Sequence, residues 1–272
     1  MSLANTPVTR LMVVGIVSTS ILASVLDVKY YFYILIDTHL WRYRQLWRLL
    51  GYQLCYTNST EVLFGTMTLY NMRIVERMWG TRKFASFIVV TYLLTSIVCP
   101  MISTVLRPLT WGLTNYVPAG PTAIIFAVLA QYHAMVPHMY KYRIATSAAP
   151  PTDDEFRGVT LSDKSYRYAL ALHLSLLQWP GSVLGALVGW VVGYSYREGI
   201  LPAGLIRWRL PGWVLGLKSH RSRTEYEGLR RRLEGQGDAA TASGAQGPQG
   251  EGQAERRRTM GQQFMSQIRE AL

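Results

Sequence analysis

The residues of this chain that could do chemistry in an apolar environment are few and far apart. His133 and His138 are five positions apart, so a helix would not place them on one face, and His173 stands alone in a later apolar stretch. No aspartate or glutamate accompanies them, although a proton relay or a metal site would need one. The two cysteines, Cys55 and Cys99, provide no disulfide framework. We therefore expect no metal and no cofactor, and we interpret the histidines as interhelical hydrogen-bonding groups.

Composition and charge distribution indicate a membrane protein. Of the 272 residues, 49% are hydrophobic and 16% are charged, against roughly 25% charged in a typical soluble domain. Arg107 is the one Lys, Arg, Asp or Glu in 84–140, and 11–26 and 168–196 contain none. Because such runs cannot form a water-exposed surface, they exclude a soluble globular enzyme. The missing acidic residues within the runs also argue against an ion-coupled transporter.

Six apolar segments predict an all-α, six-span helical bundle. A bilayer core of about 30 Å needs roughly 20 helical residues, and the predicted spans cover residues 11–26, 59–75, 84–106, 122–136, 166–179 and 181–196. Several are short, which implies tilt or local thinning of the bilayer. The loops that a cytosolic N-terminus would place inside hold 23 Lys and Arg, and the outside loops hold five. The positive-inside rule thus predicts both ends in the cytosol and explains the basic tail without nucleic-acid binding.

The loop between the first two spans, residues 27–58, is rich in aromatic residues and arginines. Tyrosine and tryptophan rings favour the level of the lipid headgroups, and arginines can extend to it. We expect this first loop to lie in the membrane interface, with Trp47 and Arg48 as its anchors, in contact with lipid. The alternative is an ordinary folded lumenal loop.

Four regions follow from these patterns. We predict a membrane domain over 1–199, a basic interfacial segment over 200–234, a disordered linker over 235–255 and a short C-terminal helix over 256–272. The linker is rich in Gly, Gln and Ala and has no aromatic residue. The last segment repeats apolar residues every four positions, as expected of a helix that docks on a partner or membrane surface.

A glycine ladder in the sixth span predicts close helix packing. Gly185, Gly189 and Gly193 recur every four residues, so they share one helix face and allow another backbone to approach. The fourth span offers a matching row of small residues, and we expect it to be the partner: Gly120, Ala123, Ala127 and Ala130.

These features together resemble a known family. Trp47-Arg48, the glycine ladder and the stretch 70–84, which reads YNMRIVERMWGTRKF, are similar to the rhomboid superfamily. Within it, the chain looks like the rhomboid-like proteins with a ubiquitin-associated domain and the rhomboid-like subunits of fungal Dsc ubiquitin-ligase complexes. In the stretch 70–84, we expect Glu76 to accept hydrogen bonds that hold the turn, with Arg73 and Arg77 as ionic partners and Gly80 as a structural residue.

The resemblance implies a lost active site. Active rhomboid proteases use a serine in a Gly-x-Ser-Gly turn at the start of span four and a histidine in span six. The matching turn here is Val117-Pro118-Ala119-Gly120, so Ala119 takes the serine's place, and Ser182 takes the histidine's. A hydroxyl needs a positioned base to become a nucleophile. We therefore predict a pseudoprotease.

The same resemblance implies a non-enzymatic scaffold of an ER or Golgi E3 ubiquitin-ligase complex. Its expected partners are multi-span subunits, a RING-type ligase and client transmembrane proteins, and its expected roles are protein quality control and activation of sterol-regulatory factors. The tail lacks the helices of a ubiquitin-associated domain, so we do not expect this chain to bind ubiquitin directly. A Derlin-like retrotranslocation factor in ER-associated degradation is the alternative.

Overall fold

The computed structural model describes residues 6–145, 158–211 and Gly228, and those through Pro211 belong to one compact unit. The predicted linker 235–255 and C-terminal helix 256–272 lie outside the described residues, as does most of the segment 200–234. Its described part contains one short helix, α9 (Ala203–Arg207). Arg82 donates to the Leu210 carbonyl and Leu210 donates to the Ser86 hydroxyl, so this part packs back onto the bundle.

A helix occupies each of the six predicted ranges. They are α1 (Pro7–Val25), α3 (Ser59–Asn71), α5 (Thr81–Leu106), α6 (Thr122–Met135), α7 (Ser165–Leu176) and α8 (Gly181–Glu198). Within the described part of the chain, α1 and α5 are long and apolar enough to cross a bilayer by length and composition. The helices α3, α6 and α7 have 13, 14 and 12 residues, or about 18–21 Å at 1.5 Å per residue.

The second predicted span, 59–75, is not one helix. The helix α3 ends at Asn71, because Met72 has φ −83° and ψ 0°, which turns the chain out of the α-helical path. A separate helix, α4 (Arg73–Trp79), follows. Gly80 then has φ +80°, a left-handed conformation that favours glycine, and it separates α4 from α5.

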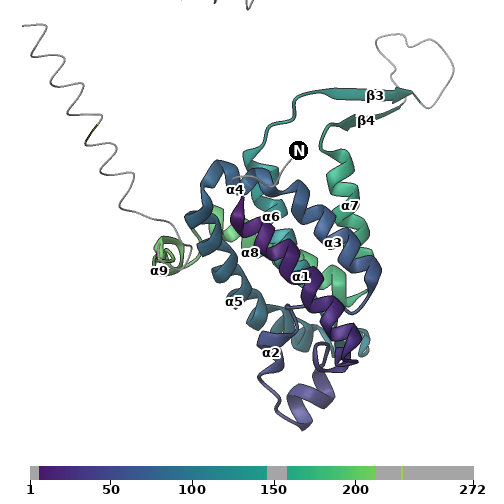
Figure 1. The fold of residues 1–272 in the computed structure, drawn as a ribbon. Helices are drawn as coiled ribbons and strands as arrows, with labels where there is room; N and C mark the ends of the chain where they lie inside the picture. Colours follow the sequence, from purple (N-terminus) through teal and green to yellow (C-terminus); the bar gives the residue numbers. More distant parts are fainter. Residues whose placement is uncertain (1–5, 146–157, 212–227, 229–272) are drawn as a thin grey trace, which may run out of the picture. The chain divides into compact units, whose positions relative to one another are not determined.

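Two small sheets correct the all-α prediction. β1 (Ile34–Leu35) pairs antiparallel with β2 (Tyr116–Val117) and joins the first loop to the segment before α6. β3 (Lys141–Ala145) pairs antiparallel with β4 (Gly158–Ser162), and this hairpin extends past the ends of α6 and α7 (Figure 1). Both pairs lie in connections between helices, where hydrophobic periodicity carries no strand signal. The remaining short elements are η1 (Lys29–Tyr31), the π-helix η2 (Ile36–Arg42), α2 (Arg48–Gly51) and η3 (Leu113–Asn115).

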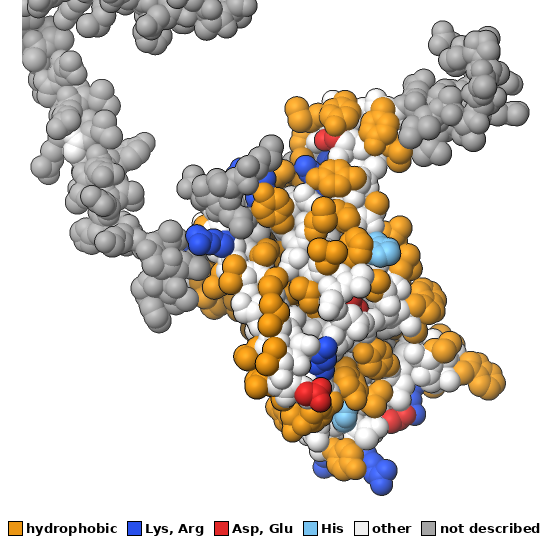
Figure 2. Space-filling view, turned by 45° about the vertical axis from the view of Figure 1, so that its right-hand side comes forward, with side chains coloured by type: hydrophobic (Ala, Val, Ile, Leu, Met, Phe, Trp, Pro, Cys, Tyr) orange, Lys and Arg blue, Asp and Glu red, His pale blue; other side chains and the backbone are white. Residues whose placement is uncertain are grey.

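The surface of the helices is apolar between two polar ends. Figure 2 shows orange side chains along the middle of the visible face, with most blue and red side chains toward its top and bottom. Leu11, Leu63, Ile97, Val105 and Val191 are each more than half exposed although they belong to α1, α3, α5 and α8. Exposed apolar side chains in this density are typical of a lipid-facing surface.

Candidate functional site

The helices α6 and α8 pack backbone against backbone. A Cβ added at Gly189 would lie 2.0 Å from the Ala123 carbonyl oxygen, and one at Gly193 would lie 2.6 Å from that of Ala127. Contacts this short admit only glycine, and they are what the predicted pairing of spans four and six requires at these positions. We call this contact the α6–α8 seam. Gln131 adds a buried hydrogen bond of 2.5 Å to the Gly193 carbonyl.

Gly185 does not belong to the α6–α8 seam. A Cβ at this position would meet no atom within 4 Å, although the four-residue spacing puts Gly185 on the same helix face as Gly189. Gly181, one turn earlier, is again tight, with the Tyr116 carbonyl oxygen 2.5 Å from an added Cβ. The helix end therefore rests on the segment before α6. The prediction for Gly185 is wrong because this residue borders a small cavity, which Pro118 and Ser182 also line, and no α6 atom lies within 4 Å of an added Cβ.

The turn 117–120 is fixed by the chain between the first two spans. Gly120 has φ +137°, and its N–H donates to the Tyr52 carbonyl at 2.7 Å. A Cβ at Gly120 would lie 2.2 Å from the Tyr56 ring, so glycine is needed for both conformation and space. Ala119 beside it is 2% exposed. Neither Ala119 nor Gly120 has an atom beyond the backbone that could act as a nucleophile.

Tyr56 is the central side chain of this region, and the sequence patterns did not single it out. It is 1% exposed, and its N–H donates to the Ser20 hydroxyl of α1 at 3.0 Å. Its own hydroxyl lies 3.2 Å from Thr122 Oγ1 at the start of α6, and its ring fills the space left by Gly65 of α3. One residue thus contacts three helices, α1 through its N–H and α3 and α6 through its side chain. The sequence signal that could have indicated a bulky neighbour is the presence of glycine at the two positions that face the ring, Gly65 and Gly120.

Ser182 and the turn line one small cavity. Its volume is about 20 Å³, and its walls include Pro118, Gly120, Thr122 and Ser182 together with Tyr52 and Cys99. A space of that size holds about one water molecule. The described residues that line it supply hydroxyls and one thiol but no imidazole, amine or carboxylate. Ser182 is 2% exposed and donates to the Leu174 carbonyl at 3.2 Å, so its hydroxyl joins α8 to α7.

The first loop folds around Arg48, which differs from the predicted interfacial anchor. The Arg48 side chain is 5% exposed, and its guanidinium donates to the carbonyls of Tyr30, Tyr31 and Tyr33 and to Gln45 Oε1. Three carbonyl oxygens converge on the guanidinium and hold the arginine inside the loop, and hydrogen bonds to a charged donor are stronger than those between neutral groups. Trp47 is 54% exposed, as an interfacial ring would be.

The end of the first loop enters the bundle. Gln53 is buried and donates to the Tyr52 hydroxyl and to Ser96 Oγ, while Thr95 Oγ1 donates to Gln53 Oε1. Tyr52 in turn donates to the Thr95 carbonyl. The hydroxyl-rich face of α5 therefore satisfies the polar groups of this inserted segment. Burial also raises the pKa of the neighbouring Cys55 thiol to about 11, which keeps it protonated at neutral pH.

A half-buried histidine and an ion pair fasten the outer part of the first loop. His39 Nδ1 accepts from the Leu35 N–H at 3.1 Å, and burial, helped by the charge of Arg48, lowers the pKa of His39. Asp37 pairs with Arg107, and its N–H donates to Asn115 Oδ1. These contacts join the π-helix η2 to the segment before α6, beside the β1–β2 pair.

Glu76 holds α1 instead of its own turn. The carboxylate is 1% exposed and accepts from the N–H of Val8, at 3.0 Å, and from the N–H and hydroxyl of Thr9, at 2.8 and 2.6 Å. An acidic group at this place satisfies free N–H groups at a helix N-terminus and stabilises the helix dipole. Arg73 stacks over the Tyr70 ring at 4.1 Å, and Arg77 follows Glu76 in α4.

His133 and His173 have different partners. His133 lies 3.0 Å from the Tyr168 hydroxyl and beside Trp190, and His173 packs on Phe64. Among the described residues, no three His, Cys, Asp or Glu side chains gather into a cluster that could hold a metal ion.

Comparison with known proteins gives one family and several relatives. A model of the family described as "Eukaryotic integral membrane protein (DUF1751)" matches residues 10–271. The chain is 32% identical over 208 residues, 76% of its length, to DSC E3 ubiquitin ligase complex subunit 2 of Schizosaccharomyces pombe. It is 27% identical over 64% of its length to Rhomboid-like protein 18 of Arabidopsis thaliana, and 26% identical over 62% to the mouse Ubiquitin-associated domain-containing protein 2.

These matches cover the relatives only in part. The chain spans about half the length of the curated relatives it matches, namely 52%, 55% and 45%. No solved structure matches it.

Proposed function

Because the chain belongs to the eukaryotic integral membrane protein family DUF1751, we propose that it is a non-proteolytic, rhomboid-like scaffold of an E3 ubiquitin-ligase complex. The observation that carries the proposal is the 32% identity over 76% of the chain to a protein named as a subunit of such a complex. Similarity to a protein named rhomboid-like supports the same architecture.

The geometry of the turn supports a scaffold without protease activity. Ala119 has no nucleophilic atom, and the cavity beside it brings no base to Ser182. A cavity of about 20 Å³ also leaves no room for the backbone of a peptide substrate. A serine mechanism requires a nucleophile, a base and a bound acyl group together.

Six crossings with both ends in the cytosol form the membrane part of the proposal. It is supported by helices in all six apolar ranges and by the excess of Lys and Arg in the loops assigned to the inside. The helices α3, α6 and α7, at about 18–21 Å, are shorter than the hydrocarbon core of about 30 Å. The bilayer around them would be thinned or distorted.

Thinning gives the scaffold a way to receive clients. A charged residue at mid-membrane costs a client helix about 2.5–3.5 kcal/mol, and that cost falls where water and headgroups come closer. Clients with polar transmembrane helices would then accumulate beside the chain and be passed to a RING-type ligase held by other multi-span subunits. In the ER or Golgi, this mechanism serves quality control and the activation of sterol-regulatory factors.

Affinity purification of the tagged chain in mild detergent, followed by mass spectrometry, tests the proposal. Recovery of a multi-span RING ligase and companions in fixed proportion is expected. Gly189→Leu should abolish that recovery, because its side chain would collide with the backbone of α6. A chain that purifies alone would overturn the proposal. Recovery of an ATP-driven extraction machine without a ligase would replace it with the Derlin-like alternative.

A further inference from the structure

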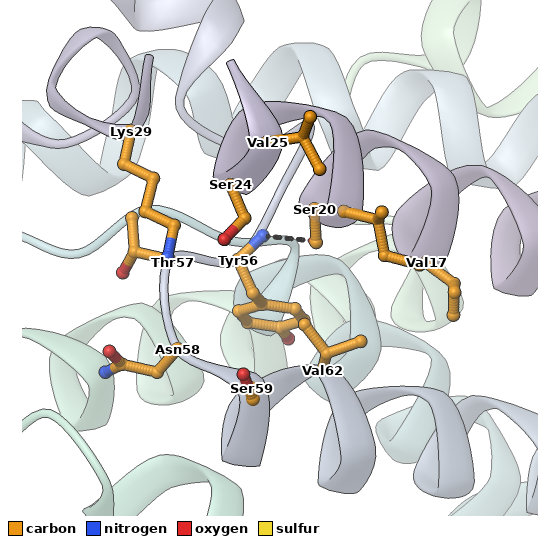
Figure 3. Close-up of a pocket in the computed structure, with 11 residues that line it drawn as sticks. Val17, Ser20, Ser24, Val25, Lys29, Tyr56, Thr57, Asn58, Ser59 and Val62 are labelled. Atoms are coloured by element: carbon orange, nitrogen blue, oxygen red, sulfur yellow. Dashed lines mark hydrogen bonds between the residues drawn. The ribbon is translucent and has the colours of Figure 1, made fainter. Parts of the chain in front are cut away.

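A groove between α1 and α3 is a cavity that the proposed function leaves unused. Its volume is about 320 Å³, and it opens beside the start of α3. Figure 3 shows its residues on three segments: the second half of α1, Lys29 after α1, and the chain from Tyr56 into the first turns of α3. The lining residues are Val17, Ser20, Ile21, Ser24, Val25, Lys29, Tyr56, Thr57, Asn58, Ser59 and Val62.

The groove has an apolar end and a polar end. Val17 and Val62 line the part that runs along the helices, whereas Lys29, Asn58 and Ser59 line the part at the helix ends (Figure 3). Ile21, one turn after Val17 on α1, also lines the groove. Along α1, Val17 and Ser24 are seven residues apart, or about 10 Å. A groove that changes from hydrocarbon to hydrogen-bonding groups over this distance matches a molecule with a polar head and an acyl chain.

The polar end is built for an anion. Lys29 is the one charged side chain among the residues that line the groove, and Figure 3 shows its amine and the Ser24 hydroxyl directed into the same space beside Thr57. The nearest acidic residues in sequence do not line it: Asp27 is exposed and Glu61 is buried elsewhere. The N-terminus of α3 also faces this end, and Asn58 makes no side-chain cap bond there. Glu61 in the first turn of α3 bonds the Asn58 backbone, so Lys29 supplies the positive charge at this end of the groove.

We propose that the α1–α3 groove binds one phospholipid, whose phosphate lies against Lys29, Ser24 and Ser59 and whose acyl chain follows Val17, Ile21 and Val62. The phosphate supplies the negative charge that complements Lys29. Lys29 follows the end of α1, and in the proposed six-crossing topology it lies at the depth of the headgroups of the leaflet opposite the cytosol. The lipid would therefore come from that leaflet.

Native mass spectrometry of the full chain in detergent tests the proposal. Short-chain phosphatidylglycerol, phosphatidylcholine and diacylglycerol are titrated in turn, with inorganic phosphate as a competitor. We expect saturable binding of one phosphatidylglycerol or phosphatidylcholine molecule and much weaker binding of diacylglycerol, which lacks the phosphate. Lys29→Gln should weaken phosphatidylglycerol binding about fivefold. Binding of diacylglycerol as tight as that of phosphatidylglycerol, or displacement of the lipid by inorganic phosphate alone, would overturn the proposal.

A matched pair of variants on α1 separates this groove from the general lipid surface. Ser24→Trp fills the groove and should abolish the bound lipid, whereas Ser18→Trp places the same ring on an exposed position of α1 outside the groove and should leave it. Equal effects of the two variants would show that the bound lipid is not in the groove. Both positions face the surface, so both variants are expected to fold, and the elution profile of the purified chain checks this.

Discussion

The α6–α8 seam and the first loop both depend on backbone carbonyl oxygens, but different groups meet those oxygens. In the seam, glycine lets one backbone lie directly on the carbonyls of Ala123 and Ala127. In the first loop, a long side chain, Arg48, reaches three carbonyls at once. A contact made by the absence of a side chain cannot adapt to a larger residue. A contact made by one charged side chain is lost when that side chain is lost.

The largest expected effect is at the α6–α8 seam. Gly189→Ala should destabilise the folded chain by about 3 kcal/mol, because the new Cβ meets backbone that cannot rotate away. Gly185→Ala is the matched control on the same helix face, and it should stabilise α8 slightly, by about 0.5–1 kcal/mol. Thermal unfolding of both variants in mild detergent gives the difference. Equal midpoints would show that the seam is not tightly packed.

The second-largest expected loss of stability is at Arg48. Arg48→Met keeps most of the aliphatic stem but leaves the Tyr30, Tyr31 and Tyr33 carbonyls without their donor, at an expected loss of about 2 kcal/mol. Arg42→Met, at an exposed position of the same loop, should have little effect. The same unfolding measurement applies, together with protease digestion of the loop. If Arg48→Met and Arg42→Met had the same stability and the same rate of digestion, the buried arginine would not organise the loop.

Variants of Tyr56 test the contact between the first loop and the start of α6, with a smaller expected loss of stability. Tyr56→Phe removes only the hydroxyl that faces Thr122, so the expected loss is about 1 kcal/mol. The ring, which fits against Gly65 and Gly120, stays in place. Tyr56→Ala should be several times more damaging, since it empties the space between three helices. A harmless Tyr56→Ala would contradict the central position of this residue.

The smallest effect concerns pH and the outer part of the first loop. The pKa of His39 is lowered in the fold, so the folded state binds fewer protons than the unfolded state. The stability that His39 contributes is therefore present above its usual pKa of about 6.5 and is lost as the pH falls through the lowered value. Amide hydrogen exchange of Leu35, corrected for its intrinsic rate, should be faster at about pH 5.5 than at about pH 7.5. His39→Gln should remove this difference.

Helix positions and small-residue faces were predictable from the sequence, because each depends on a local period. The glycine spacing identified both α8 and its partner α6. The same spacing could not show that Gly185 lies outside the α6–α8 seam, since the atoms that a glycine faces depend on the path of other segments of the chain. Glu76 was recognisable as a polar anchor, but it accepts hydrogen bonds from Val8 and Thr9, which lie 68 and 67 residues earlier in the chain.

Long-range contacts also explain what the sequence did not show at the site. Arginine in an aromatic-rich loop is typical of the membrane interface, and only the folded loop brings three carbonyls around Arg48. Tyr56 is one of many aromatic residues in that loop, and its importance comes from Ser20, Gly65 and Thr122 on three different helices. The β1–β2 pair has two residues on each strand, too few for an alternating pattern.

The three-helix contact of Tyr56 also has a consequence for the order of synthesis. Thr122, its partner on α6, emerges 66 residues after it. At about 5–20 residues per second, that interval lasts about 3–13 s. During this time the first helices reside in the membrane with the space around Tyr56 still open. By length and composition, α1 and α5 can cross a bilayer, and both are synthesised before α6 and α8. The contact between Tyr56 and Thr122 therefore closes only after both of these long helices have been made.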